Sequence, residues 1–157
     1  MPNDMSPIPS GQAFTLTNFL EGKTKAWGIF EDRFAQVKLR MSVEMNGAWS
    51  GDTFVLSEAF KYDDGREEQR QWHIKQIDDR NFTGTCADCI GKALGHIQND
   101  RIDMRYRFRL KLKNRVIHVD FFDRLIRLDE KRVFNRATMF KWGVRLGDVS
   151  LFFEKSS

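Results

Sequence analysis

Charged and apolar residues alternate without interruption from Arg101 to Lys113. The apolar members are Ile102, Met104, Tyr106, Phe108, Leu110 and Leu112. A period of two places one set of side chains on one face of a β-strand and the other set on the opposite face. The segment therefore predicts a long strand with one face toward an apolar interior and the other toward water.

Similar alternation recurs along most of the chain. Further strands are predicted over residues 37–45, 54–62, 72–74, 82–89, 91–97, 116–128, 133–142 and 144–153. Turns are predicted at Asn46-Gly47, Asp64-Gly65, Asp78-Asp79, Asn99-Asp100 and Lys113-Asn114, because these residue types favour tight turns. A short helix or lid is expected over residues 14–21.

Eight to ten consecutive strands without helical spacers predict an all-β fold. The pattern favours an antiparallel up-and-down β-barrel, since closure removes the free edges of the sheet. A two-sheet sandwich is the alternative architecture. A barrel of about eight strands is wide enough to enclose one small ligand.

The chain has 157 residues, 41% of them hydrophobic, which suits one folded domain. We expect residues 1–13 to form a flexible leader and residues 14–157 a single barrel domain. The polar start carries no basic segment followed by an apolar stretch, so we expect no signal peptide and a cytoplasmic location. Removal of a leader from the natural chain would instead allow a periplasmic or membrane-associated location.

The net charge of +4 is unevenly distributed. Residues 101–115 hold seven basic residues and one acidic residue, Asp103. The predicted anionic-surface residues are Arg105, Arg107, Arg109, Lys111 and Lys113. Acidic neighbours such as Asp120 would equally neutralise this face. Nucleic acid is not expected as a partner, because Tyr106 and Phe108 point away from the basic face.

Several short motifs occur in a fixed order along the chain. They are Phe19-Leu20-Glu21-Gly22, Ala26-Trp27-Gly28, Asp52, Glu58-Ala59-Phe60, Tyr62-Asp63-Asp64-Gly65, Arg70-Gln71-Trp72, Asn135-Arg136-Ala137 and Phe152-Phe153. In these motifs the chain resembles an uncharacterised family of proteobacterial proteins. The resemblance implies a lipocalin-like or calycin-like barrel without an assigned activity, and many members look like lipoproteins. This chain differs in lacking a lipobox and in having Phe122-Asp123-Arg124 where acidic and then aromatic residues are expected.

Several polar side chains share the phase of the apolar residues and are expected to point into the barrel. The predicted ligand-binding residues are Glu58, Arg70, Trp72, Tyr106, Asp123, Phe54, Phe60 and Phe108. An isolated interior charge is costly, so we expect Glu58 and Arg70 to pair with each other or to meet the polar end of a ligand. For Asp123 the expected partners are Arg136 or Arg70.

These residues favour a non-enzymatic protein that binds a small apolar or amphipathic ligand, such as a lipid or fatty acid. One alternative is a small barrel enzyme that uses an interior carboxylate as acid or base, and another is an adaptor that binds anionic surfaces through the basic face. No catalytic residue, metal or cofactor is assigned. His118 and Asp120 lie two residues apart on one face of a predicted strand, a spacing that allows an acid/base pair, but we expect a solvated strand face.

Cys86 and Cys89 have the spacing of a redox or metal pair. A structural zinc site needs four ligands, and the chain has no second cysteine pair. An extended strand would turn the two side chains to opposite faces. We therefore expect no site at these cysteines.

Overall fold

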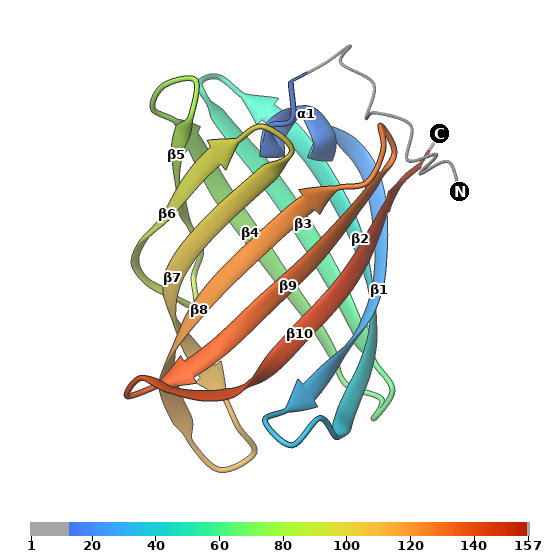
Figure 1. Ribbon diagram of the computed structural model, residues 1–157, viewed down its shortest axis with the longest axis vertical. Helices are drawn as coiled ribbons and strands as arrows, with labels where there is room; N and C mark the ends of the chain where they lie inside the picture. The colour runs from blue at the N-terminus through green and yellow to red at the C-terminus, as the bar shows by residue number, and fades with distance from the viewer. Residues whose placement is uncertain (1–12, 157) are drawn as a thin grey trace, which may run out of the picture.

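A computed structural model describes residues 13–156, which form a closed antiparallel barrel of ten strands with one short helix (Figure 1). The elements are α1 (Leu16–Leu20), β1 (Gly22–Asp32), β2 (Val37–Ser50), β3 (Thr53–Tyr62), β4 (Glu67–Gln76), β5 (Asn81–Thr85), β6 (Cys89–Gln98), β7 (Arg101–Lys111), β8 (Val116–Arg127), β9 (Arg132–Lys141) and β10 (Val144–Lys155). Each strand pairs with the next, and β1 pairs with β10. The predicted up-and-down barrel is confirmed, and the sandwich alternative is wrong.

The alternation in β7 separates the interior of the barrel from its surface. Ile102, Met104 and Phe108 are buried, whereas Arg105 and Arg107 are exposed. Antiparallel pairing with β8 places residues of the same face side by side, as in the pair Met104 and Asp123. The interior of the barrel is therefore lined by the apolar residues of the alternating pattern, as the sequence predicts.

The turn predicted at Asn46-Gly47 is wrong. Strand β2 continues through these residues, and the turn follows at residues 51–52. A Cβ atom on Gly47 would lie 2.3 Å from the Leu20 carbonyl oxygen and 2.4 Å from Cζ of Phe54. Glycine is needed there because α1 and an aromatic ring approach the backbone closely, not because the chain turns.

Helix α1 covers one end of the barrel. The Thr15 hydroxyl accepts a hydrogen bond from the Asn18 backbone N–H at 3.0 Å and caps the first turn. Leu16, Phe19 and Leu20 are buried against the barrel interior. Nζ of Lys155 donates to the Phe19 carbonyl oxygen at 2.7 Å, which ties the end of β10 to the helix. The helix or lid predicted over residues 14–21 is thus present, and most of the predicted leader lies outside the described residues.

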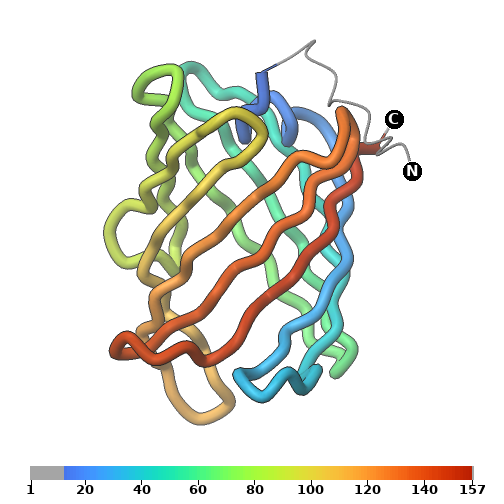
Figure 2. Tube along the Cα trace, viewed as in Figure 1, coloured from blue at the N-terminus to red at the C-terminus, as the bar shows by residue number. Residues whose placement is uncertain are grey.

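The barrel has two different ends, which Figure 2 shows along the chain trace. The α1 end also carries the turns at residues 51–52, 77–80, 99–100 and 128–131. The opposite end, called the mouth below, carries the turns at residues 33–36, 63–66, 86–88, 112–115 and 142–143.

Candidate functional site

A cavity of about 590 Å³ runs through the barrel interior. At the α1 end it is bounded by Leu16 and Leu20. At the mouth its lining includes the exposed side chains of Lys38 and Arg66, so the cavity reaches the surface there. This volume is typical of a site that holds one small molecule.

Strands β3 and β4 place Glu58 and Arg70 directly opposite each other, half-way along the cavity. Oε1 of Glu58 accepts a hydrogen bond from Nε1 of Trp72 at 3.0 Å. The Arg70 guanidinium lies over the rings of Phe60 and Phe108, 4.9 Å and 4.7 Å from their centroids.

The expected ion pair of Glu58 with Arg70 does not form among the described residues. Nε of Arg70 is buried and has no hydrogen-bond partner in that part of the chain. An arginine in this state holds its charge over two aromatic faces and keeps one N–H donor unused.

Strands β7 and β8 contribute a second polar pair at the same depth. The Tyr106 hydroxyl lies 3.2 Å from each carboxylate oxygen of Asp123 and donates to this group. The Tyr106 ring also stacks on Phe121 and meets Trp72 edge-on, with centroid distances of 5.3 Å in both cases. Tyr106 therefore joins the aromatic lining to Asp123.

The predicted partner of Asp123 needs correction. Its hydrogen-bond partner is Tyr106, and Arg70 acts on it only through charge. Arg136 is exposed, because it follows buried Asn135 along β9 and points to the outer face. Because its side chain points outward, Arg136 does not lie beside the inward-facing Asp123.

Burial raises the pKa of Glu58 from 4.5 to about 7, although Arg70 and Trp72 favour its ionised form. Burial also raises the pKa of Asp123 from 3.8 to about 7. The Tyr106 hydrogen bond and the Arg70 charge oppose this rise, whereas the negative charge of Glu58 adds to it. Two carboxyl groups inside the barrel therefore titrate together near neutral pH, beside a permanent positive charge.

Seven of the eight predicted ligand-binding residues lie on the cavity wall. They are Glu58, Arg70, Trp72, Tyr106, Asp123, Phe60 and Phe108. Phe54 is fully buried but lies outside the lining, where it packs edge-on against Trp49 at 5.3 Å. Whether the seven bind a ligand remains a prediction.

Sequence reasoning missed Asn135 on β9. This residue is buried between Val133 and Ala137, lines the cavity, and has an Oδ1 atom without a hydrogen-bond partner among the described residues. Its signal was present in the sequence, because Asn135 shares the phase of Val133, Ala137 and Met139. A polar residue in an apolar phase marks an interior polar position.

The prediction that Cys86 and Cys89 face apart is wrong. These residues form a turn in which the Cys89 N–H donates to the Cys86 carbonyl oxygen at 3.1 Å. The two sulfur atoms lie 2.8 Å apart. The contact with Cys89 holds the pKa of the Cys86 thiol below its ordinary value.

The outer face of β7 is basic, as the alternation predicts, but part of its charge is neutralised. Arg107 pairs with Asp120 at 3.0 Å, and Lys111 pairs with Asp88 at 3.5 Å. Asp120 is thus a partner of Arg107 rather than of His118. Among residues 13–156 no group of His, Cys, Asp or Glu side chains is arranged to hold a metal ion. No helix in the same range has the length and hydrophobicity to cross a membrane.

Comparison with solved structures supports the lipocalin-like fold. The chain is similar to the S-type phycobiliprotein lyase CPES from Guillardia theta, with a TM-score of 0.63 and 8% identity over 87% of this chain and 88% of that one. It is also similar to Rv2717c from M. tuberculosis, with a TM-score of 0.61 and 12% identity over 88% and 93% of the two chains. At these identities the likeness concerns the fold alone.

A search of curated proteins finds no match. A family model described as "Protein of unknown function (DUF3833)" matches residues 8–155, which is nearly the whole chain. The protein therefore belongs to the DUF3833 family.

Proposed function

We propose that the protein binds one amphipathic molecule of the fatty-acid type inside the barrel, with its polar end at the Arg70 cluster. The observation that carries this proposal is the unused N–H donor of Arg70, buried half-way along an otherwise mainly apolar cavity. A ligand carboxylate satisfies this donor through a charge-assisted hydrogen bond. Burial of the hydrocarbon tail against the apolar walls supplies the remaining driving force.

The lining supports a tail on either side of the cluster. Toward the α1 end the walls include Leu56 and Leu125, and toward the mouth they include Leu110 and Ile117. Oδ1 of Asn135 is a second polar atom without a protein partner, and it accepts a hydrogen bond from a protonated ligand group. The site thus combines few polar contacts with extensive apolar surface, as ligand pockets commonly do.

The test uses delipidated protein, cis-parinaric acid as the fluorescent probe, and displacement by oleate or oleyl alcohol. Arg70→Met should weaken oleate binding about 10- to 100-fold, the effect of one lost charge-assisted hydrogen bond, while oleyl alcohol binding changes less. Arg107→Met is the matched control, because Arg107 lies on the outer face of β7. Circular dichroism confirms that each variant retains the barrel.

A second variant tests the cavity itself. Ala137 is a small residue on the cavity wall, so Ala137→Phe places a ring in the space that the ligand needs. Folded Ala137→Phe protein should lose saturable binding of both oleate and oleyl alcohol. Absence of saturable binding by the wild type, or equal oleate affinity of Arg70→Met and wild type, would contradict the proposal.

A second candidate function is general acid or base catalysis. It is favoured by the position of Glu58 and Asp123 in a cavity with pKa values of about 7, where a carboxyl group exchanges protons near neutral pH. 5-Nitrobenzisoxazole tests this, because its ring opening needs only a base. Turnover by the wild type that Glu58→Gln or Asp123→Asn abolishes would support catalysis. A rate equal to that of buffer would count against it.

A further inference from the structure

The turns at the mouth carry large apolar side chains that nothing in residues 13–156 covers. Phe34 in the turn 33–36 is 70% exposed, and Trp142 in the turn 142–143 is 88% exposed. Leu112, Val116 and Val144 are also exposed at or beside these turns. The turns of the α1 end contain no aromatic residue. Exposed large apolar side chains on the turns at the open end of a barrel are typical of a surface that contacts a partner.

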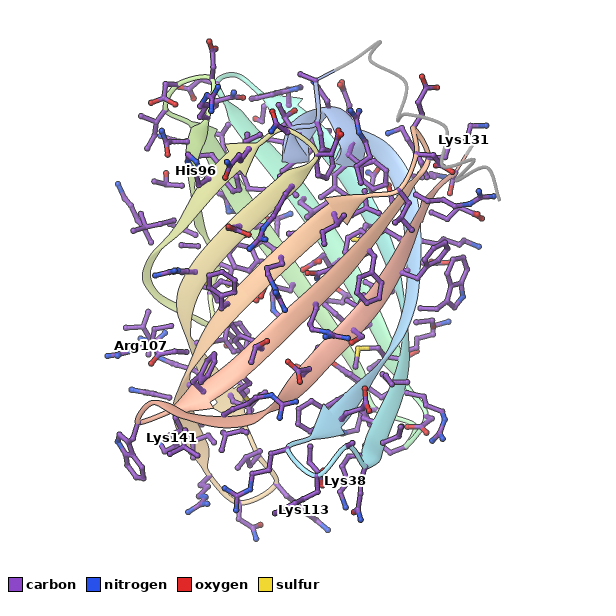
Figure 3. All side chains as sticks on the ribbon, viewed as in Figure 1. Lys38, His96, Arg107, Lys113, Lys131 and Lys141 are labelled. Carbon is purple, nitrogen blue, oxygen red and sulfur yellow. The ribbon has the colours of Figure 1, made fainter. Side chains whose placement is uncertain are left out.

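Basic side chains accompany these aromatic residues. The Arg33 guanidinium lies 4.9 Å from the Phe34 ring centroid, and Nζ of Lys141 lies 4.4 Å from that of Trp142. Figure 3 shows Lys38 and Lys113 at the mouth and Lys131 at the α1 end. Aromatic rings next to cations are the side chains that proteins place at the boundary between lipid headgroups and hydrocarbon.

The two ends of the barrel carry opposite charge. The five turns of the mouth contain four basic and three acidic residues, a net charge of +1. The four turns of the α1 end contain two basic and six acidic residues, a net charge of −4. A negatively charged surface therefore attracts the mouth and repels the α1 end.

The carboxylates at the mouth are already occupied. Asp64 pairs with Arg66 at 2.8 Å, and Asp88 pairs with Lys111 at 3.5 Å. Arg33, Lys113 and Arg115 have no carboxylate partner within the described part of the chain. These three cations remain available to anionic headgroups.

We propose that the mouth docks on an anionic phospholipid bilayer, with Phe34 and Trp142 in the headgroup region and the free cations against the phosphates. The proposal rests on the proposed function, because docking matters only if the cavity exchanges a ligand with the bilayer. It differs from binding through the outer face of β7, since the surface involved is the end of the barrel and includes apolar contacts.

The experiment measures sedimentation of the full chain with vesicles of phosphatidylcholine alone or mixed with phosphatidylglycerol. We expect binding to the mixed vesicles only, weakened by added salt because salt screens headgroup attraction. Each basic residue near such a surface contributes a factor of about five to affinity, so Lys113→Gln with Arg115→Gln should weaken binding about 25-fold. Phe34→Ser with Trp142→Ser should weaken it about tenfold or more.

The matched controls lie at the α1 end. Ile77 is 63% exposed in the turn 77–80, and Lys131 lies in the turn 128–131. Ile77→Ser and Lys131→Gln should leave vesicle binding unchanged. Brominated acyl chains should quench the wild-type tryptophan fluorescence and quench Trp142→Ser markedly less.

Three results would overturn docking at the mouth. They are no binding to the mixed vesicles at low salt, equal binding to neutral vesicles, or equal loss in the controls and the mouth variants. The first is also the result expected if the mouth binds an acidic protein instead. Parinaric acid binding without vesicles is measured on the same samples. If the protein binds parinaric acid but not the vesicles, docking is rejected and the proposed function stands. If it binds the vesicles but not parinaric acid, the proposed function is rejected and docking stands.

Discussion

Replacement of Glu58 by glutamine should stabilise the barrel at neutral and alkaline pH but not in acid. The pKa of Glu58 is about 7 in the fold and 4.5 as its ordinary value, so folding favours the protonated form. That contribution to stability is fully present below the ordinary pKa and is lost as the pH rises through about 7. A pKa difference of this size corresponds to about 3 kcal/mol well above pH 7.

Glutamine removes the charge and keeps the oxygen that accepts the Trp72 hydrogen bond. Glu58→Gln should therefore match the wild type near about pH 4 and exceed it by up to about 3 kcal/mol near about pH 9, with most of the gain already present at about pH 7. For a domain of this length the gain corresponds to a Tm increase of roughly 6–12 °C. Urea unfolding and thermal melts at the two pH values measure it.

Glu44→Gln is the matched control. Glu44 lies on the outer face of β2, with a side chain that is 72% exposed and a contact of 3.9 Å to Lys25. Loss of such a surface pair changes stability by less than about 1 kcal/mol. A Glu58→Gln variant no more stable than the wild type at alkaline pH would refute the raised pKa of the buried Glu58 carboxyl group.

Three other outcomes are expected. Oleate affinity should fall by about tenfold between about pH 6 and about pH 8, because ionised Glu58 and Asp123 repel the ligand carboxylate, whereas oleyl alcohol affinity in the same displacement assay stays constant. Oxidised glutathione should link Cys86 to Cys89 by a disulfide and release two molecules of reduced glutathione. The Cys89→Ser variant should stop at a mixed disulfide between Cys86 and glutathione, and mass spectrometry distinguishes the two products. Free thiols that persist in the wild type would contradict this prediction. Gly47→Ala should lower the free energy of unfolding in urea by about 1–3 kcal/mol, because its Cβ has no room beneath α1, whereas Ala48→Ser should not.

Much of the barrel was predictable from the alternation of apolar and polar residues along the chain. The alternation in residues 101–113 assigns β7 both its inner and its outer face, and the Asp64-Gly65 pair locates the turn between β3 and β4. The misplaced turn at Gly47 has a different origin. A glycine serves equally well at a turn and where another segment approaches closely, and only the position of α1 distinguishes the two uses.

The sequence predicts which residues line the candidate site, but not which of them contact one another. Phase alone places Glu58, Arg70, Tyr106 and Asp123 in the interior. Partner choice depends on the curvature of the closed sheet, which brings Tyr106 to Asp123 and leaves Arg70 between two aromatic rings. The sulfur contact was missed because residues 86–88 form a turn where alternation suggests a continuous strand.

The depth of the polar cluster and the chemistry of the mouth together favour one direction of ligand transfer. A fatty acid in a bilayer keeps its polar group at the surface, so a docked mouth meets that group first and the tail follows. An anionic bilayer with a surface potential of about −30 mV concentrates protons and lowers the pH at its surface by about half a unit. Glu58 and Asp123, whose pKa values are about 7, are buried half-way along the cavity, so only the part of this potential that reaches them raises their protonation. On the proposed docking, we expect the docked protein to hold its ligand slightly more tightly than the free protein, which would favour uptake at the surface.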